Sequence, residues 1–155
     1  MTLLPYLDGE RTPNLPAARG LLAGLTRVNA SPANLARAAV EGLLCGLADG
    51  LDALRGQGVP VERILLIGGG AGSKAVRALA PALLGAPVAI PRPAEYVALG
   101  AARQAAWALS AEAGPGAAGP PSWPLAGTAE YAAEPAPHVR AQYAALRDAT
   151  AAWGD

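Results

Sequence analysis

Apolar residues recur with helical spacing over the twenty-odd residues that follow Ser31, the longest periodic stretch of the chain. Ser31 and Pro32 are typical of a helix start, with a hydroxyl N-cap and a proline at the first helical position. Gly56 and Gly58 predict its end. The apolar face of this helix, which we expect to pack on the core, consists of Leu35, Ala38, Ala39, Leu43, Leu47, Leu51 and Leu54.

Short aliphatic runs alternate with further amphipathic stretches. Strands are predicted over residues 21–26, 63–67 and 88–90, and helices over residues 74–84 and 94–111. The run 63–67 is continuously aliphatic after its first residue, which is typical of a strand buried on both faces of a parallel sheet. The alternation therefore predicts an α/β fold with parallel pairing, preceded by an extended, turn-rich entry over the first twenty residues.

The later part of the chain changes in composition. Residues 111–136 are rich in proline and glycine and are expected to form an irregular linker. A last helix is predicted over residues 137–153, with Val139, Tyr143, Leu146 and Thr150 on one face. The predicted organisation is an α/β domain over residues 1–110, the linker, and this helix.

Composition and charge exclude several classes of function. Twelve basic and twelve acidic residues cancel, so no net field favours nucleic acid or an anionic membrane. No apolar run reaches the ~18 residues of a membrane span, and the N-terminus does not resemble a signal peptide, so a cytoplasmic location is expected. The single cysteine, Cys45, lies in an apolar setting and is predicted to be a buried structural thiol, while His138 is expected to be a surface or packing residue.

The most informative motif is the glycine-rich segment LLIGGGAGSKA, where the second predicted strand runs into a helix. Glycines at the carboxyl end of a buried strand let the backbone approach a ligand, and the following helix presents free amides. We therefore expect the chemistry of the chain to lie at this turn.

The residues of the turn exclude one nucleotide-binding motif and leave two interpretations open. A P-loop is excluded, because Ser73 stands in place of the second glycine and Ala75 in place of the metal-binding hydroxyl. A dinucleotide fingerprint is met by Gly70, Gly72 and Ala75, and although no acidic residue follows the next strand, Arg92 could serve a 2′-phosphate. An NADP site and a purely structural turn therefore both remain open.

A third interpretation comes from resemblance. Five blocks follow one another in order and spacing over about residues 3–110: LLPYLDGERTP, RGLLAGLT, AVEGLLCGLADGLDAL, LLIGGGAGS and EYVALGAA. Together they resemble the C-terminal half of the FGGY-family carbohydrate kinases, and within that family the xylulokinases. The helix containing HVRAQYAAL is also similar to the end of family members.

The resemblance implies the actin/hexokinase-like ATPase (ribonuclease H-like) fold, with ATP and sugar meeting between two domains. It assigns the adenosine motif of ATP to Gly68, Gly69, Gly70, Ala71 and Ser73. Residues without bulk would let the nucleoside lie against the backbone, and the Ser73 hydroxyl could contact the base while capping the next helix. Lys74 is expected to face solvent, and the GERTP block is expected to have a structural or hinge role.

The departures from the family pattern are equally informative. The catalytic aspartate, the sugar contacts and the first phosphate motif belong to the N-terminal domain of the family, and neither a DxGT nor a GTS sequence occurs here. The resemblance therefore predicts a domain truncated at its N-terminal strands, with no catalytic residue and no Mg²⁺ ligand of its own, which does not phosphorylate a sugar alone. Residues 21–26 would form an exposed sheet edge, so a homodimer or association with an N-terminal half is expected.

The leading hypothesis is the nucleotide-binding C-terminal part of a xylulokinase-like sugar kinase, which takes ATP in this chain and a sugar only together with the N-terminal domain. The alternatives are a non-catalytic remnant or interaction module that keeps the fold without binding nucleotide, and an NADP-binding domain.

Overall fold

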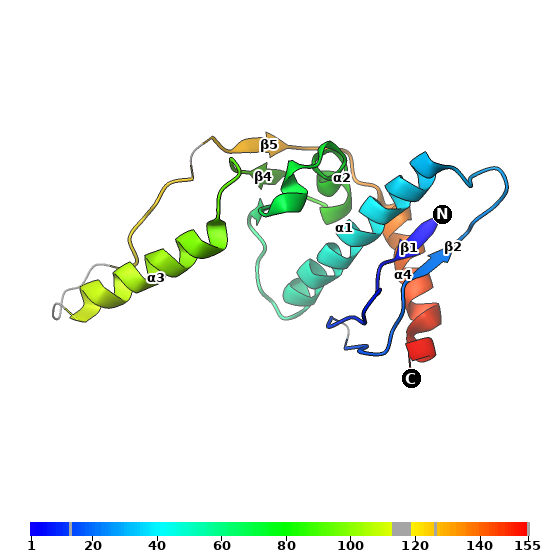
Figure 1. The fold of residues 1–155 in the computed structure, drawn as a ribbon, viewed down its shortest axis with the longest axis horizontal. Helices are drawn as coiled ribbons and strands as arrows, with labels where there is room; N and C mark the ends of the chain where they lie inside the picture. Colours follow the sequence, from blue (N-terminus) through cyan, green and yellow to red (C-terminus); the bar gives the residue numbers. More distant parts are fainter. Residues whose placement is uncertain (13, 113–118, 126, 155) are drawn as a thin grey trace.

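The computed structural model describes residues 1–12, 14–112, 119–125 and 127–154. It contains two small sheets joined by helices (Figure 1). In the first sheet, β1 (Thr2–Leu4) pairs antiparallel with β2 (Leu21–Ala23), and Leu3 lies opposite Leu22. In the second, β3 (Ile64–Leu65) pairs in parallel with β4 (Val88–Ile90), and β4 pairs antiparallel with β5 (Ala129–Tyr131).

Four α-helices connect and cover these strands. They are α1 (Pro32–Gly56), α2 (Lys74–Leu84), α3 (Tyr96–Glu112) and α4 (Pro137–Thr150). Helix α1 contacts β1, α2 and α4, and α3 extends away from the rest of the molecule (Figure 1). A 3-10 turn, Ala151–Gly154, follows α4. Among the described residues, no helix is long and apolar enough to cross a membrane.

Local signals predicted several element boundaries. The Ser31 hydroxyl accepts a hydrogen bond from the Asn34 amide, as an N-cap should. Helix α2 begins after Ser73 and ends at Gly85, whose φ of 72° is the left-handed conformation that favours glycine. Helix α2 also continues through Pro81, which lies inside it.

The strand predictions need three corrections. Thr2–Leu4 forms a strand within the entry that is expected to be extended and turn-rich. This strand pairs with β2, whereas β2 is expected to join the parallel sheet. The aliphatic run 63–67 contains only a two-residue strand. The predicted linker 111–136 contains β5, because the unpaired edge of β4 accepts a third strand. Residues 113–118 of that linker lie outside the described residues.

The predicted buried face of α1 is correct for Ala38, and Leu51 packs partly buried against the core, but the prediction is wrong for four leucines. Leu35, Leu43, Leu47 and Leu54 are each exposed by 43–51%. The buried face instead carries Ala38, Gly42, Leu44, Cys45 and Ala48. Small residues on that face let the helix approach β1 closely: a Cβ at Gly42 would overlap the carbonyl oxygen of Leu3.

The core lies where β1, α1, α2, β4 and α4 meet. It includes Leu4, Leu44, Leu83, Val88 and Tyr143, each no more than 3% exposed. Cys45 is fully buried among them, and burial raises the pKa of its thiol to about 11. The prediction of a buried structural cysteine is confirmed, since an uncharged thiol is a poor nucleophile at neutral pH.

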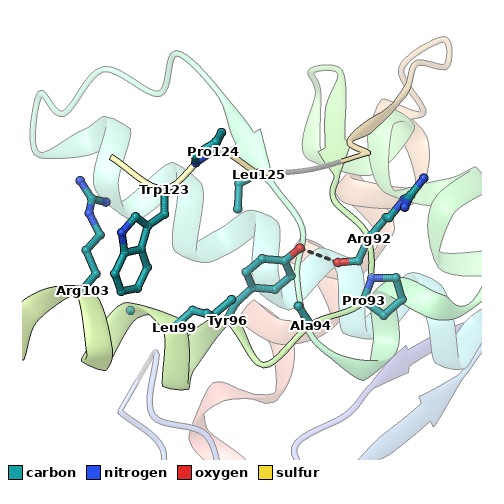
Figure 2. Close-up of a pocket in the computed structure, with 10 residues that line it drawn as sticks. Arg92, Pro93, Ala94, Tyr96, Leu99, Arg103, Trp123, Pro124 and Leu125 are labelled. Carbon is teal, nitrogen blue, oxygen red and sulfur yellow. Dashed lines mark hydrogen bonds between the residues drawn. The ribbon is translucent and has the colours of Figure 1, made fainter. Parts of the chain in front are cut away.

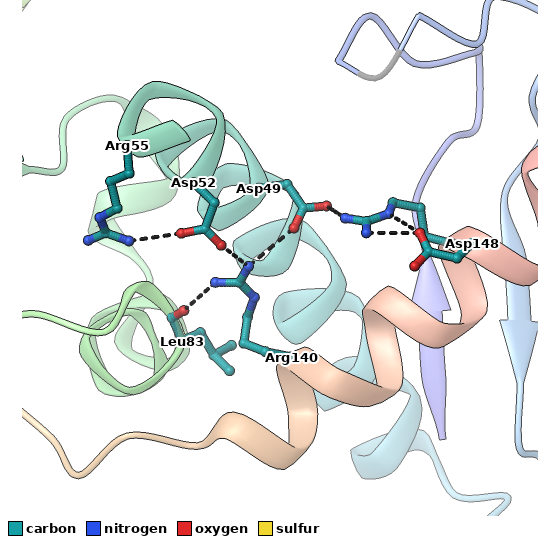
Figure 3. A network of polar contacts seen from close by, with 7 residues as sticks. Asp49, Asp52, Arg55, Leu83, Arg140 and Asp148 are labelled. Atoms are coloured by element: carbon teal, nitrogen blue, oxygen red, sulfur yellow. Dashed lines mark hydrogen bonds and ion pairs between the residues drawn. The ribbon is translucent and has the colours of Figure 1, made fainter. Parts of the chain in front are cut away.

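A charged network fastens α4 to α1 and α2 (Figure 3). The Arg140 guanidinium donates to Asp49 Oδ1 at 3.2 Å, to Asp52 Oδ2 at 2.7 Å and to the Leu83 carbonyl at 3.3 Å. Arg147 donates to the second oxygen of Asp49 at 2.5 Å. Arg140 thus connects three helices and contacts the last carbonyls of α2, where a cation is favourable.

Replacing Arg140 by methionine is expected to lower the free energy of unfolding by about 1–2 kcal/mol, because charged hydrogen bonds between helices are lost. The hydrogen bond from Arg140 holds the pKa of Asp52 below its usual range. This stabilisation is present above about pH 4 and is lost as pH falls through the lowered pKa. Urea unfolding at pH 7 and at about pH 3 should therefore show a smaller acid effect in the variant. Arg55→Met, which removes only an exposed pair within α1, should change stability by less than about 0.5 kcal/mol.

Candidate nucleotide site

The glycine turn lies at the carboxyl end of β3, the parallel-paired strand. Gly68 has φ 94° and ψ 176°, a conformation essentially restricted to glycine. Gly69–Gly72 then forms a 3-10 turn, in which the Ala71 amide donates to the Gly68 carbonyl at 3.1 Å. The Ser73 hydroxyl accepts from the Val76 amide and begins α2. The sequence thus folds the turn so that backbone, not side chains, faces outward.

A cavity of about 240 Å³ opens at this turn. Its walls come from the end of β3, the turn, α2 and the segment between β4 and α3, and include Gly68, Gly69, Ala71, Gly72, Arg77, Pro93, Glu95 and Tyr96. A Cβ added at Gly68, Gly69 or Gly72 would meet no atom within 4 Å. The bare backbone of these glycines is therefore open to a ligand.

The predicted site residues divide into two groups. Gly68, Gly69 and Ala71 line the cavity, whereas Gly70 and Ser73 lie on the same turn but do not line it. The capping role of Ser73 is confirmed, and contact with a ligand stays a prediction. Lys74 is exposed, as expected.

Sequence reasoning missed Arg77. Its Nε donates to the Ala71 carbonyl at 2.6 Å, and its side chain lines the cavity. Ala71 is only 7% exposed, so this bond holds the middle of the turn from the inside. Glu95 lines the same cavity from the segment before α3, so one cation and one carboxylate border it.

Replacing Arg77 by methionine should loosen the turn, because the Ala71 carbonyl loses its side-chain donor. We expect stability to fall by about 1 kcal/mol and ADP affinity to fall about fivefold to tenfold. Calorimetric titration measures the second effect. Arg77→Lys keeps the charge without the planar donor, so it should behave like the methionine variant if Arg77 positions the turn. Wild-type affinity in Arg77→Lys would show that charge alone matters.

Other candidate residues lie elsewhere. The Glu10 carboxylate accepts from the amides of Arg11 and Thr12 and so stabilises its own exposed loop, whose Pro13 lies outside the described residues. His138 is exposed in the first turn of α4. Within the described part of the chain, no group of three His, Cys, Asp or Glu side chains is placed to hold a metal ion.

A second, larger cavity of about 520 Å³ lies between α3 and residues 121–125 (Figure 2). It is lined by Arg92, Tyr96, Leu99, Arg103 and Trp123 among others. The Tyr96 hydroxyl donates to the Arg92 carbonyl, and Arg103 donates to the carbonyl of Pro121 at 2.5 Å. The sequence predicts residues 119–125 to be part of the linker. Within them, Trp123 is the large aromatic residue that indicates packing against another element.

Comparison with known proteins decides the family. The family model of the C-terminal domain of the FGGY family of carbohydrate kinases matches residues 1–109. The chain belongs to the FGGY family of carbohydrate kinases. The predicted α/β class with the actin/hexokinase-like ATPase fold, in the form of a partial domain, is confirmed.

Individual FGGY kinases are similar to the chain at high identity. The xylulose kinase of Streptomyces coelicolor is 49% identical over 113 residues, which are 72% of this chain and 23% of that protein. The xylulose kinase of Streptomyces rubiginosus is 48% identical over the same length, with the same coverage. The crystal structure of xylulose kinase from Bifidobacterium adolescentis superimposes with a TM-score of 0.75 at 51% identity, covering 94% of this chain and 28% of that one. The chain thus spans about a quarter of the length of the FGGY kinases that it matches.

Proposed function

We propose that the chain is the nucleotide-binding C-terminal part of a xylulokinase-like sugar kinase. In the complete enzyme it would hold the adenosine of ATP against the glycine turn, while a ketose hydroxyl is delivered by the N-terminal domain. The observation that carries the proposal is the open backbone of Gly68, Gly69 and Gly72 at the carboxyl end of a parallel strand. Ligands of open α/β sheets bind at such ends.

The residues of the cavity fit an adenine nucleotide. The cavity, at about 240 Å³, is slightly smaller than the ~300–1,000 Å³ of complete ligand pockets, as expected for one wall of a site closed by another domain. Arg77 supplies a positive charge for the polyanionic ligand, and α2 presents its N-terminus to the same turn. Mg²⁺ would neutralise phosphate charge in the complete enzyme, but among the described residues the only carboxylate lining the cavity is Glu95, so we propose that its ligands come from outside this chain.

The proposal includes inactivity of the chain by itself. Phosphoryl transfer needs a group that orients the acceptor hydroxyl, metal-binding carboxylates and donors around the β- and γ-phosphates. The described residues around the glycine turn do not supply such a set. Association with an N-terminal half, or a homodimer through the free edge of β2, belongs to the same proposal.

Calorimetric titration of the purified chain with ADP, ATP and NADPH tests the proposal. Adenine nucleotides should bind and NADPH should bind no better than ADP. Preferred binding of NADPH would favour the dinucleotide interpretation, and no binding of any of the three would favour a remnant without nucleotide function. In the same preparation, ADP release from ATP and xylulose should stay at the background rate; measurable turnover would contradict inactivity of the isolated chain.

A further inference from the structure

A surface helix normally buries its large apolar side chains and exposes its polar ones, but helix α1 exposes several leucines. Four of its leucines, Leu35, Leu43, Leu47 and Leu54, are about half exposed, while the face that carries Leu44 and small residues is buried. On the helical wheel, at about 100° per residue, these leucines gather on one half of the helix together with Ala36, Ala39 and Gly50. We name this surface of α1 the leucine face.

The charges of α1 lie on the other half of the helix. These residues are Arg37, Glu41, Asp49, Asp52 and Arg55, and each lies at least about 120° from the centre of the leucine face. Asp49 and Asp52 point toward α4, where they bind Arg140 (Figure 3). The charged residues of α1 thus lie outside the leucine face, whose aliphatic side chains are half exposed in this chain. A helix that is apolar on its free side is normally buried.

We infer that the leucine face is the docking surface for the portion of an FGGY kinase that precedes this domain in its relatives, an inference that rests on the proposed function. The chain covers 23–28% of the length of two xylulose kinases that are 49–51% identical to it. A partner made of the remaining three quarters of such an enzyme is large enough to cover the face. This holds whether that portion is supplied by the same polypeptide or by a separate one.

The chemistry of the face fits this occupant. Transient protein interfaces have about the same polar composition as the rest of the protein surface. Permanent interfaces are more apolar and resemble a protein core. The leucine face carries no charged residue, so its composition resembles that of a permanent interface. An α/β domain is built of packed layers, and a helix whose small-residue face is used against β1 and α2 needs a further layer on its leucine side.

The test compares the same double substitution, Leu43→Ser with Leu47→Ser, in two settings. One is the isolated full chain. The other is a chimera in which the chain replaces the matching C-terminal region of the Streptomyces coelicolor xylulose kinase. Both leucines are about half exposed in the isolated chain, so its melting temperature should change little. In the chimera it should fall by about 4–8 °C, because the leucines are buried there.

A matched control is Leu7→Ser with Val28→Ser, two apolar residues that are 73% and 93% exposed outside α1. This control should leave the chimera unchanged. The proposal is overturned if the Leu43/Leu47 variant melts like wild type in the chimera, if it destabilises the isolated chain equally, or if the wild-type chimera does not fold.

Sedimentation of the isolated chain gives a second measurement. We expect the chain to bind an apolar dye such as anilinonaphthalene sulfonate, with most of the dye signal lost in the Leu43/Leu47 variant, and we expect wild type and variant to sediment alike. A stable dimer of the chain that this variant dissociates would instead assign the face to a second copy and overturn the proposal.

ADP titration separates the docking proposal from the proposed function. If the Leu43/Leu47 variant loses docking but binds ADP normally, the nucleotide site is intact. If wild type binds no ADP, the proposed function alone is rejected.

Discussion

Replacing Tyr143 by alanine is expected to lower the free energy of unfolding by about 3–5 kcal/mol. Tyr143 is among the largest side chains of the core and is 1% exposed. Its ring lies between α4 and α1, where its hydroxyl comes within 3.6 Å of the position that a Cβ on Gly46 would take. Alanine would leave a cavity at the contact that fixes α4 on α1. Urea unfolding followed by circular dichroism measures the loss, which is a large share of the ~5–15 kcal/mol that stabilises a typical domain.

The matched variant Tyr143→Phe separates the contribution of the ring to core packing from the effect of the buried hydroxyl. Burial and the neighbouring Tyr6 hydroxyl raise the pKa of the Tyr143 hydroxyl, and no group of the described residues, Tyr6 included, meets it with hydrogen-bond geometry. Phenylalanine keeps the ring and removes the unpaired polar group, so its stability should equal or exceed that of wild type. A loss of about 2 kcal/mol or more in Tyr143→Phe would show that the hydroxyl makes a bond in solution.

Replacing Gly69 by leucine is expected to lower ADP affinity by about tenfold or more while leaving the fold intact. A side chain at Gly69 would meet no protein atom within 4 Å, so the folded chain accommodates it. Gly69 lines the cavity, and the new side chain would fill the space in which we propose the nucleoside lies. Calorimetric titration with ADP measures the affinity, and thermal unfolding shows that the fold is retained.

Two comparisons make this result specific. Gly69→Ala should have a smaller effect than Gly69→Leu, since the obstruction grows with side-chain size. Gly70→Leu adds the same bulk to the same turn at a residue that does not line the cavity, so its effect should also be smaller. Equal ADP affinity in wild type and Gly69→Leu would place the nucleotide elsewhere.

The glycine turn could be found from the sequence because its requirements are local. A positive φ at Gly68 and a hydroxyl cap at Ser73 are properties of one strand-to-helix junction, and each has its own residue signature. Arg77 could not be assigned in the same way. Its Nε reaches back to the Ala71 carbonyl only when the turn and α2 have their folded geometry, and an arginine in the first turns of a helix is otherwise unremarkable.

The sequence by itself determined the positions of the helices, the caps Ser31, Ser73 and Gly85, the strand β4 and the family. These follow from short-range signals, such as Ser31 before Pro32 or Gly85 after Leu84, and from the order of motifs. Only the tertiary structure decided which side of α1 is buried. Leu35, Leu43, Leu47 and Leu54 lie on one half of that helix, whereas the buried half carries Leu44 and mostly small residues, so hydrophobic periodicity alone favours the four leucines. Close approach to the backbone of β1 requires the small residues instead, because a side chain at Gly42 would collide with Leu3. That steric requirement turns the leucines outward and leaves the uncovered face from which the docking surface is inferred.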